Sequence, residues 1–184
     1  MSLPQPKHPG HTIEDWKTWE GRWELIHGVA YDMTPAPSLE HQSVSMVLSA
    51  QIFTLLSEAK RKTGGGDCKV FAAPVDLYLP NQESVYQPDL VIVCDPSMLA
   101  DSRGIFGIPN LVCEILSPST TRRDLWTKRQ CYETAGVPEY LIVDPEEREG
   151  LLLRLEGGRY EETARIKWGA AVALLGGKLP ITLG

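Results

Sequence analysis

The sequence has no apolar stretch that could cross a membrane. Its longest apolar runs, such as Leu151–Leu153 and Ala170–Leu175, fall far short of the roughly 20 residues that a bilayer-spanning helix needs. The first ten residues contain one lysine and no apolar stretch follows them, so they do not resemble a secretory signal. We therefore expect a cytoplasmic protein with no membrane partner.

Paired cysteines are also missing. The four cysteines, Cys68, Cys94, Cys113 and Cys131, form no CxxC pair, which argues against a zinc ribbon. Their surroundings instead predict small buried side chains in a reducing compartment. The sequence also lacks the Walker A, GxGxxG, HExxH and GxSxG motifs. Enzymes built on those motifs are therefore poorly supported.

An excess of positive charge is absent as well. The chain has 18 Lys and Arg against 24 Asp and Glu, a formal net charge of -6. Nucleic-acid-binding proteins usually carry a basic surface, so the overall charge does not favour that class. The segment Thr121–Arg129 nevertheless holds four basic residues, and such a local cluster can coexist with an acidic remainder.

What is present suits one soluble domain. The chain has 184 residues, of which 42% are hydrophobic and 23% charged, as in ordinary globular proteins. We expect a loosely ordered N-terminus over residues 1–12 and a single domain over residues 13–184. The expected elements are a short helix or turn at residues 13–21, a hairpin over Trp23–Met33, a helix from Ser38 to about Lys62, strands over Lys69–Leu79, Asp89–Cys94 and Asn110–Leu116, a helix over Asp124–Ala135, a strand over Glu139–Val143, a hairpin over Leu151–Leu155 and Arg159–Arg165, and a short extended tail. This order predicts a mixed α/β fold whose helices cover a central sheet.

Two acidic residues stand out against apolar strands. Asp89 directly precedes the run Leu90–Val93, and Glu114 interrupts the run Leu111–Leu116. A carboxylate in such a strand is costly unless it is paired or binds a cation. Two acids on neighbouring strands are the oxygen ligands that Mg²⁺ uses. The alternatives are a turn-forming aspartate at Asp89 and an ion pair at Glu114.

A set of short motifs runs through most of the chain. They are WELIHG (Trp23–Gly28), APSLEHQ (Ala36–Gln42), APVDLYL (Ala73–Leu79), PDL (Pro88–Leu90), CEILSPST (Cys113–Thr120) and AGVPEYLIVDP (Ala135–Pro145), together with Asp124, Lys128 and Tyr132. In this combination the chain resembles the Uma-two family of proteins described as restriction endonucleases, within the PD-(D/E)XK nuclease superfamily. The resemblance implies a restriction endonuclease-like α/β fold, with a central mixed β-sheet flanked by helices.

The resemblance also implies site residues. Asp89 matches the acid of the PD pair and Glu114 matches the second acid, but the lysine position of the motif holds Leu116. Such nucleases often supply the lysine from the following helix, which makes Lys128 the candidate. Lys128 shares a helix face with residues expected to pack on the sheet. Its alternative is an exposed ion pair with Asp124, worth about 0.3–0.5 kcal/mol.

Further residues are candidates for the same site. In this superfamily a helical glutamate often completes the metal shell, so Glu40 is an expected third ligand; its alternative is a first-turn glutamate that complements the helix dipole. Ser117, Arg122 and Arg123 are expected phosphate contacts, or an ordinary turn and solvated side chains. His41 is expected to contact substrate, or to make a structural hydrogen bond.

The combined prediction is an endonuclease that uses Mg²⁺ (or Mn²⁺) to hydrolyse phosphodiester bonds in nucleic acid, with DNA as the expected substrate. The leucine at position 116 and the acidic charge leave open a nuclease-fold protein that binds nucleic acid without cutting it. A dimeric interaction protein is a further alternative. By analogy with nucleases of this fold, we expect a homodimer.

Overall fold

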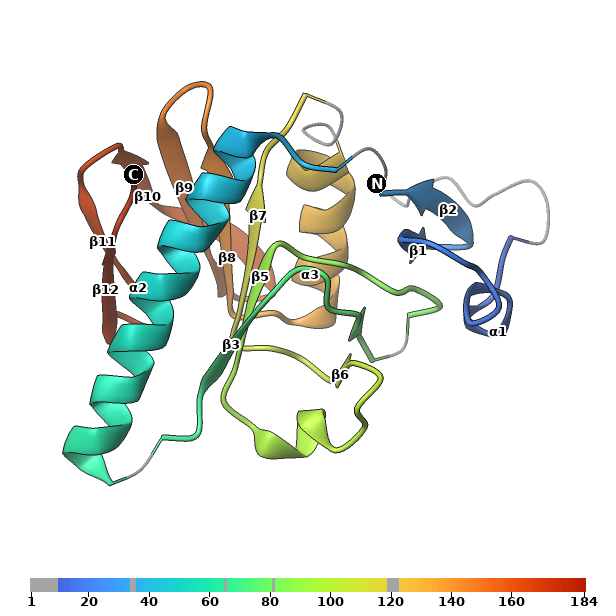
Figure 1. Ribbon diagram of the computed structural model, residues 1–184, viewed down its shortest axis with the longest axis horizontal. Helices are drawn as coiled ribbons and strands as arrows, with labels where there is room; N and C mark the ends of the chain where they lie inside the picture. Colours follow the sequence, from blue (N-terminus) through green and yellow to red (C-terminus); the bar gives the residue numbers. More distant parts are fainter. Residues whose placement is uncertain (1–9, 34–35, 65, 81, 119–122) are drawn as a thin grey trace.

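The centre of the molecule is a six-stranded mixed sheet (Figure 1). The computed structural model describes residues 10–33, 36–64, 66–80, 82–118 and 123–184. Along the sheet the strands are β10 (Arg159–Lys167), β9 (Glu149–Glu156), β8 (Glu139–Asp144), β7 (Leu111–Ile115), β5 (Leu90–Val93) and β3 (Lys69–Ala72). Neighbours are antiparallel except for β7 and β8, which run parallel. This is the mixed sheet that the sequence predicts.

Side chains of the central strands alternate between two apolar layers, because successive residues of a strand point to opposite faces. In β5, Leu90 and Ile92 belong to one layer, and Val91 and Val93 belong to the other. All four residues are fully buried. The sheet is therefore covered on both faces, which explains why its central strands are apolar throughout.

The first face is covered by α2 (Leu39–Thr63) and by a hairpin of β11 (Ala171–Leu174) and β12 (Leu179–Thr182). Ser38 caps α2 by accepting a hydrogen bond from the His41 N–H, and Gly64 ends it in the left-handed conformation with φ 66°, as helix ends prefer. Val44, Leu48 and Ile52 of α2 pack on the sheet. The predicted helix is confirmed.

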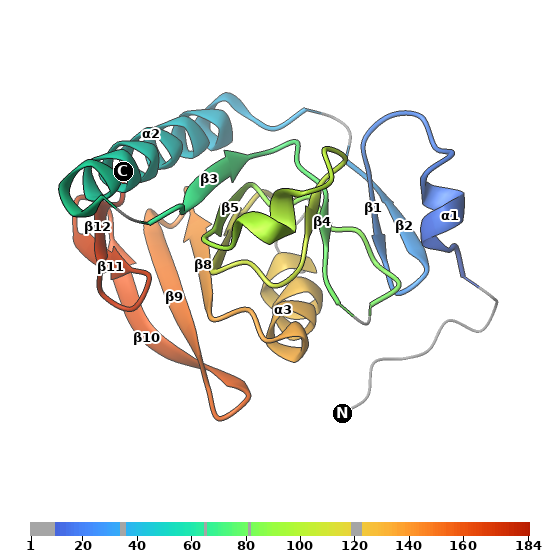
Figure 2. The same cartoon turned by 90° about the horizontal axis from the view of Figure 1, so that it is seen from below.

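The second face is covered by a π-helical turn, η2 (Arg123–Lys128), that continues into α3 (Arg129–Ala135). Figure 2 shows α2 and α3 on opposite sides of the sheet. The N-terminal hairpin of β1 (Trp23–Ile26) and β2 (Val29–Asp32) lies beside α3, following the short helix α1 (Ile13–Trp16). The remaining short elements are β4 (Leu77–Tyr78), η1 (Pro96–Leu99) and β6 (Ile105–Phe106).

Two expected elements differ from the structure. The single strand expected over Lys69–Leu79 is divided into β3 and β4, with Pro74 between them; proline has no N–H to donate to a strand ladder. The tail is a hairpin, because the turn at residues 175–177 adopts positive φ throughout and buries Leu174 and Leu179 against the core that α2 also contacts.

The sequence predicts four buried, reduced cysteines, and the structure confirms this for two of them. Cys113 and Cys131 are free and buried, but Cys68 and Cys94 form a disulfide. Lys69 pairs with Val93 in the β3–β5 ladder, so the next residue outward on each strand is a cysteine facing its partner.

Most of the N-terminal segment that we expected to be loosely ordered lies outside the described residues. His11 and Thr12 are anchored, since the His11 N–H donates to the Gly28 carbonyl and Thr12 caps α1. None of the described helices is both long and apolar enough to span a membrane.

Candidate functional site

Asp89 and Glu114 belong to adjoining parts of the sheet, since Asp89 directly precedes β5 and Glu114 lies in the neighbouring strand β7. The antiparallel register of β5 and β7 pairs Leu90 with Cys113. The two carboxylates contact different partners: Asp89 contacts His41 and the Ile115 N–H, whereas Glu114 contacts Lys128 and Tyr132.

The Asp89 carboxylate is held by two groups. Its Oδ2 accepts a hydrogen bond from the Ile115 N–H at 2.8 Å and lies 3.2 Å from His41 Nε2. His41 is thereby placed against Asp89 by the first turn of α2, with its side chain 9% exposed. Of the two alternatives for His41, the structure shows a hydrogen-bonding contact, and this contact orients the Asp89 carboxylate.

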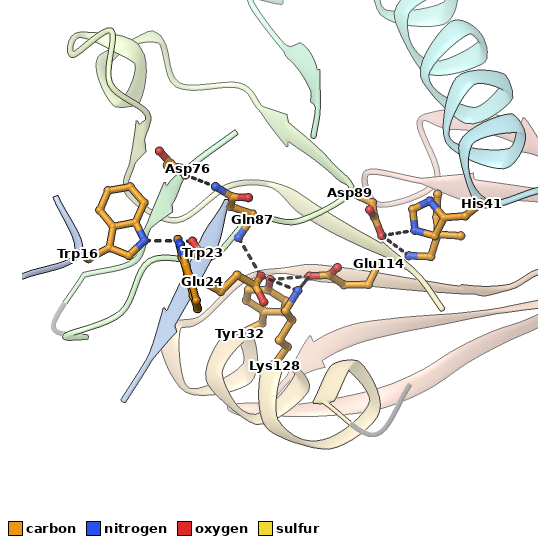
Figure 3. Close-up of polar contacts among 11 residues, drawn as sticks. Trp16, Trp23, Glu24, His41, Asp76, Gln87, Asp89, Glu114, Lys128 and Tyr132 are labelled. Atoms are coloured by element: carbon orange, nitrogen blue, oxygen red, sulfur yellow. Dashed lines mark hydrogen bonds and ion pairs between the residues drawn. The ribbon is translucent and has the colours of Figure 1, made fainter. Parts of the chain in front are cut away.

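Glu114 is the meeting point of η2, α3 and the sheet (Figure 3). Its Oε1 lies 2.9 Å from Lys128 Nζ and accepts a hydrogen bond from the Tyr132 hydroxyl at 2.8 Å. Glu114 is 3% exposed and Lys128 is 1% exposed, so Lys128 does not lie on a solvated helix face; the Asp124 side chain lies outside the described part of the chain. Leu116, at the lysine position of the motif, is an apolar residue of the core. The amine beside Glu114 comes instead from Lys128.

A third acid, Glu24, completes this cluster and was missed by the sequence interpretation. Its Oε1 lies 2.7 Å from Lys128 Nζ and accepts a hydrogen bond from the Gln87 N–H at 2.9 Å. Glu24 is fully buried on β1. The available signal was the acid in the apolar run Trp23–Ile26, the same kind of signal that marked Glu114.

A polar chain continues from Glu24 toward the surface. Gln87 donates through its side chain to Asp76 Oδ1 at 2.8 Å, and Figure 3 shows Asp76, Gln87, Glu24 and Lys128 in sequence. Burial raises the pKa of Asp76 above its ordinary value, against the opposing effect of the hydrogen bond from Gln87. The segment that ends in Asp89 is thus tied to the N-terminal hairpin.

Electrostatics keep the neighbouring phenol and thiols protonated. Burial, together with the carboxylates of Glu114 and Glu24, raises the pKa of Tyr132 well above its ordinary value. Tyr132 therefore remains a hydrogen-bond donor to Glu114. Burial likewise raises the pKa of the Cys113 and Cys131 thiols, so these cysteines are unsuited to act as nucleophiles or thiolate ligands.

Of the other predicted site residues, the structure describes the side chains of Glu40 and Ser117. Glu40 is exposed and borders a surface groove whose other lining residues are Ser43, Val44, Val47, Leu48, Trp168 and Gly184. On α2 it is His41, one residue further along, that contacts Asp89. Ser117 is half-buried just after β7, whereas Arg122 lies outside the described residues and only the backbone of Arg123 is described.

The carboxylates of Asp89 and Glu114 are the candidate metal ligands of this site. Among the described residues no group of three or more His, Cys, Asp or Glu side chains is placed to hold a metal ion. Mg²⁺ is commonly held by one or two carboxylates, with water and substrate phosphate completing its shell. Asp89 and Glu114 fit that requirement.

A solved structure shares the fold of this chain. A crystal structure of a putative nuclease belonging to DUF820 from Anabaena variabilis ATCC 29413 superposes with a TM-score of 0.73, covering 94% of both chains at 15% sequence identity. The chain thus has a nuclease-type α/β fold.

The family follows from the sequence match. Residues 12–174 match the model of the Uma2 (Uma-two) family, described as putative restriction endonuclease, and the chain belongs to that family. It is also 29% identical over 145 residues to the uncharacterized protein slr1290 of Synechocystis sp. (strain ATCC 27184 / PCC 6803 / Kazusa), covering 76% of this chain and 72% of that protein.

Proposed function

We propose that this protein is a metal-dependent endonuclease that hydrolyses phosphodiester bonds, with DNA as substrate and Mg²⁺ (or Mn²⁺) as cofactor. The observation that carries the proposal is Lys128 Nζ at 2.9 Å from Glu114 of β7, with a second acid, Asp89, directly before the neighbouring strand β5. Family membership supports the same reading. A bound divalent cation would lower the pKa of a water molecule and neutralise charge on the phosphate.

The chain's own residues would have distinct roles. Asp89 and Glu114 would hold the cation, and His41 with the Ile115 N–H would orient the Asp89 carboxylate. Lys128 would stabilise negative charge that develops on the phosphate. Glu40 is not part of this proposed ligand set, because it is exposed beside the groove formed with Trp168 and Gly184.

Glu24 and Tyr132 would act as positioning residues. A lysine has four flexible bonds in its side chain, and confining it needs several contacts. Glu24 holds Lys128 Nζ at 2.7 Å from the side opposite to Glu114, and Tyr132 donates to the same oxygen of Glu114. The network would therefore preorganise the amine beside the metal-binding acids.

Substrate contacts are proposed for the segment after β7. Ser117, Arg122 and Arg123 would bind phosphate oxygens next to Glu114.

Cutting both strands of a duplex requires two active sites, so we also propose that the protein acts as a homodimer. A nuclease of cellular DNA would work in the cytoplasm, the location we propose.

Cleavage assays test the proposal. Supercoiled plasmid, labelled single-stranded DNA and labelled RNA would be incubated with the protein in Mg²⁺, in Mn²⁺ and in EDTA. We expect metal-dependent DNA cleavage that Asp89→Asn removes and that Asp144→Asn retains. Asp144 is the matched control because its carboxylate receives the Glu147 N–H in a turn. Equal cleavage by wild type and Asp89→Asn would contradict the assignment.

One observation favours a second candidate, a nuclease-fold protein that binds nucleic acid without cutting it. Lys128 is 1% exposed and is bonded to two carboxylates, which shields its charge from a substrate. DNA binding in EDTA that equals binding in Mn²⁺, with no product in any metal, would support this candidate over the nuclease.

A further inference from the structure

The outer face of α2 carries large apolar side chains that nothing described in the structure covers. Leu39, Met46 and Phe53 are 86%, 69% and 64% exposed. Each is one heptad from the next, so with 3.6 residues per turn they form one line along the helix. This line lies opposite Val44, Leu48 and Ile52, which pack on the sheet. Figures 1 and 2 show α2 along the outside of the molecule.

Small residues alternate with the large ones on this face. Ser43, Ala50 and Ser57 follow Leu39, Met46 and Phe53 by four residues each. We name these six residues the outer stripe. Their spacing of four and three residues is the heptad pattern of helices that pack against another helix. All six are uncharged, and three of them are large apolar side chains that are more than half exposed; exposed apolar side chains gathered on one face mark an interaction site.

We propose that the outer stripe binds the outer stripe of a second copy of this chain, with the two α2 helices antiparallel. In the register that sets Met46 beside Ala50 of the partner subunit, the other layers also match. Phe53 then meets the partner's Ser43, and Leu39 meets the partner's Ser57. Each layer holds one large and one small side chain, so the two helices can approach closely along their whole contact. The pattern is self-complementary, as a two-fold interface requires.

Charge selects the antiparallel orientation. The last turn of α2 contains Lys60, Arg61 and Lys62, and the first turn contains Glu40. In a parallel pair the basic last turns of the two helices would lie side by side and repel each other. The antiparallel pair separates the two basic ends and places each toward the acidic end of its partner, which also opposes the two helix dipoles favourably.

Solution mass measurements test the surface. Sedimentation equilibrium or light scattering, without nucleic acid, should give a dimer for wild type and a monomer for Met46→Lys. The matched control is Trp126→Lys, since Trp126 is 71% exposed but lies on η2, and it should stay dimeric. A monomeric wild type at tens of micromolar, or a dimeric Met46→Lys with a native circular dichroism spectrum, would overturn the proposal. The first result would favour a different partner for the stripe.

Cross-linking tests the register. In the antiparallel pair, Ala50 and the partner's Ala50 are displaced by four residues, about 6 Å along the axis, whereas the two Thr54 positions are displaced by twelve, about 18 Å. A short bis-maleimide should therefore join Ala50→Cys chains and not Thr54→Cys chains. The native cysteines do not compete, because two are disulfide-bonded and two are buried. Cross-linking of Thr54→Cys alone would overturn the register. Neither measurement depends on whether the protein cleaves DNA.

Discussion

The Lys128 amine lies 2.9 Å from the Glu114 carboxylate, with both side chains almost fully buried. The lysine comes from η2 and the glutamate from β7, so the pair joins a helix to the central strand of the sheet. In the sequence motif of such nucleases the lysine follows the acid on the same strand, where this chain has Leu116. In this chain the amine beside the acid therefore comes from η2 and not from the strand of the acid.

Replacing Lys128 by methionine should strongly destabilise the fold. The change leaves Glu24 and Glu114 buried without their shared cation, and breaking a buried ion pair costs about 3–5 kcal/mol. Urea denaturation would measure the loss. Lys62→Met is the matched control, because the Lys62–Glu58 pair lies on the surface and should contribute no more than about 0.5 kcal/mol. Equal effects of the two substitutions would contradict the role of Lys128 as the centre of the cluster.

Glu24→Gln should separate positioning from metal binding. Glutamine keeps the size of the side chain but loses the charge that holds Lys128 at 2.7 Å. Loss of a supporting contact typically costs about 10- to 100-fold in activity, so we expect kcat to fall by that factor while Mn²⁺ affinity is unchanged. Glu114→Gln should lower both quantities. A Glu24→Gln protein with wild-type kcat would show that Glu24 serves stability alone.

Calorimetry should distinguish the acids that bind metal from the one that does not. Asp89→Asn should weaken Mn²⁺ binding by about tenfold or more, since the site has few carboxylate ligands. Glu40→Gln should bind Mn²⁺ like wild type, because Glu40 is exposed beside the groove that includes Trp168. Weakened binding by Glu40→Gln would return this residue to the metal shell that the family resemblance implied.

Asp76→Asn should change how stability depends on pH. Burial raises the pKa of Asp76 above its ordinary value of 3.8, so the folded state binds this proton more tightly than the unfolded state. Its contribution therefore favours folding at low pH and is lost as the pH rises above 3.8 through the folded-state pKa. Asparagine does not titrate and can still accept the hydrogen bond from Gln87.

Urea unfolding from pH 3 to pH 7 would measure this effect. The stability of Asp76→Asn relative to wild type should rise across the range. A difference that stays constant with pH, or that falls, would contradict the raised pKa.

Removing the Cys68–Cys94 bond should lower stability. The two cysteines are 26 residues apart, and closing a loop of that length limits the unfolded chain by about 3–4 kcal/mol in the entropic model. Thermal or urea unfolding of Cys68→Ser/Cys94→Ser would measure the loss. The control is wild type in dithiothreitol, which should match the double variant. Four thiols titrated in unreduced, denatured wild type would show that the bond is absent in solution.

Much of the fold could be predicted from local sequence pattern. The helix after Ser38 has an N-cap, an apolar stripe and a terminal glycine, and each of these acts within a few residues. The apolar strands and the acids within them, Asp89 and Glu114, are visible for the same reason. The family model and the shared fold agree with that interpretation.

What the pattern missed depends on contacts between distant segments. Glu24 reaches Lys128 only because the N-terminal hairpin packs beside α3. The tail forms a hairpin because β11 and β12 bury leucines against the core shared with α2. Local propensity does not report either contact, since each is decided by which surfaces remain to be covered after the sheet has formed.

The sequence by itself determined most of the elements, the two candidate acids and the family, because these follow from periodicity and from short motifs. Only the tertiary structure decided which acid and which base meet. The sheet order placed the strand that follows Asp89 beside the strand of Glu114. The packing of η2 brought Lys128 to Glu114, and the first turn of α2 placed His41 against Asp89 and left Glu40 exposed. The type of each side chain limits the interactions that it can make, whereas strand order and packing decide which residues meet.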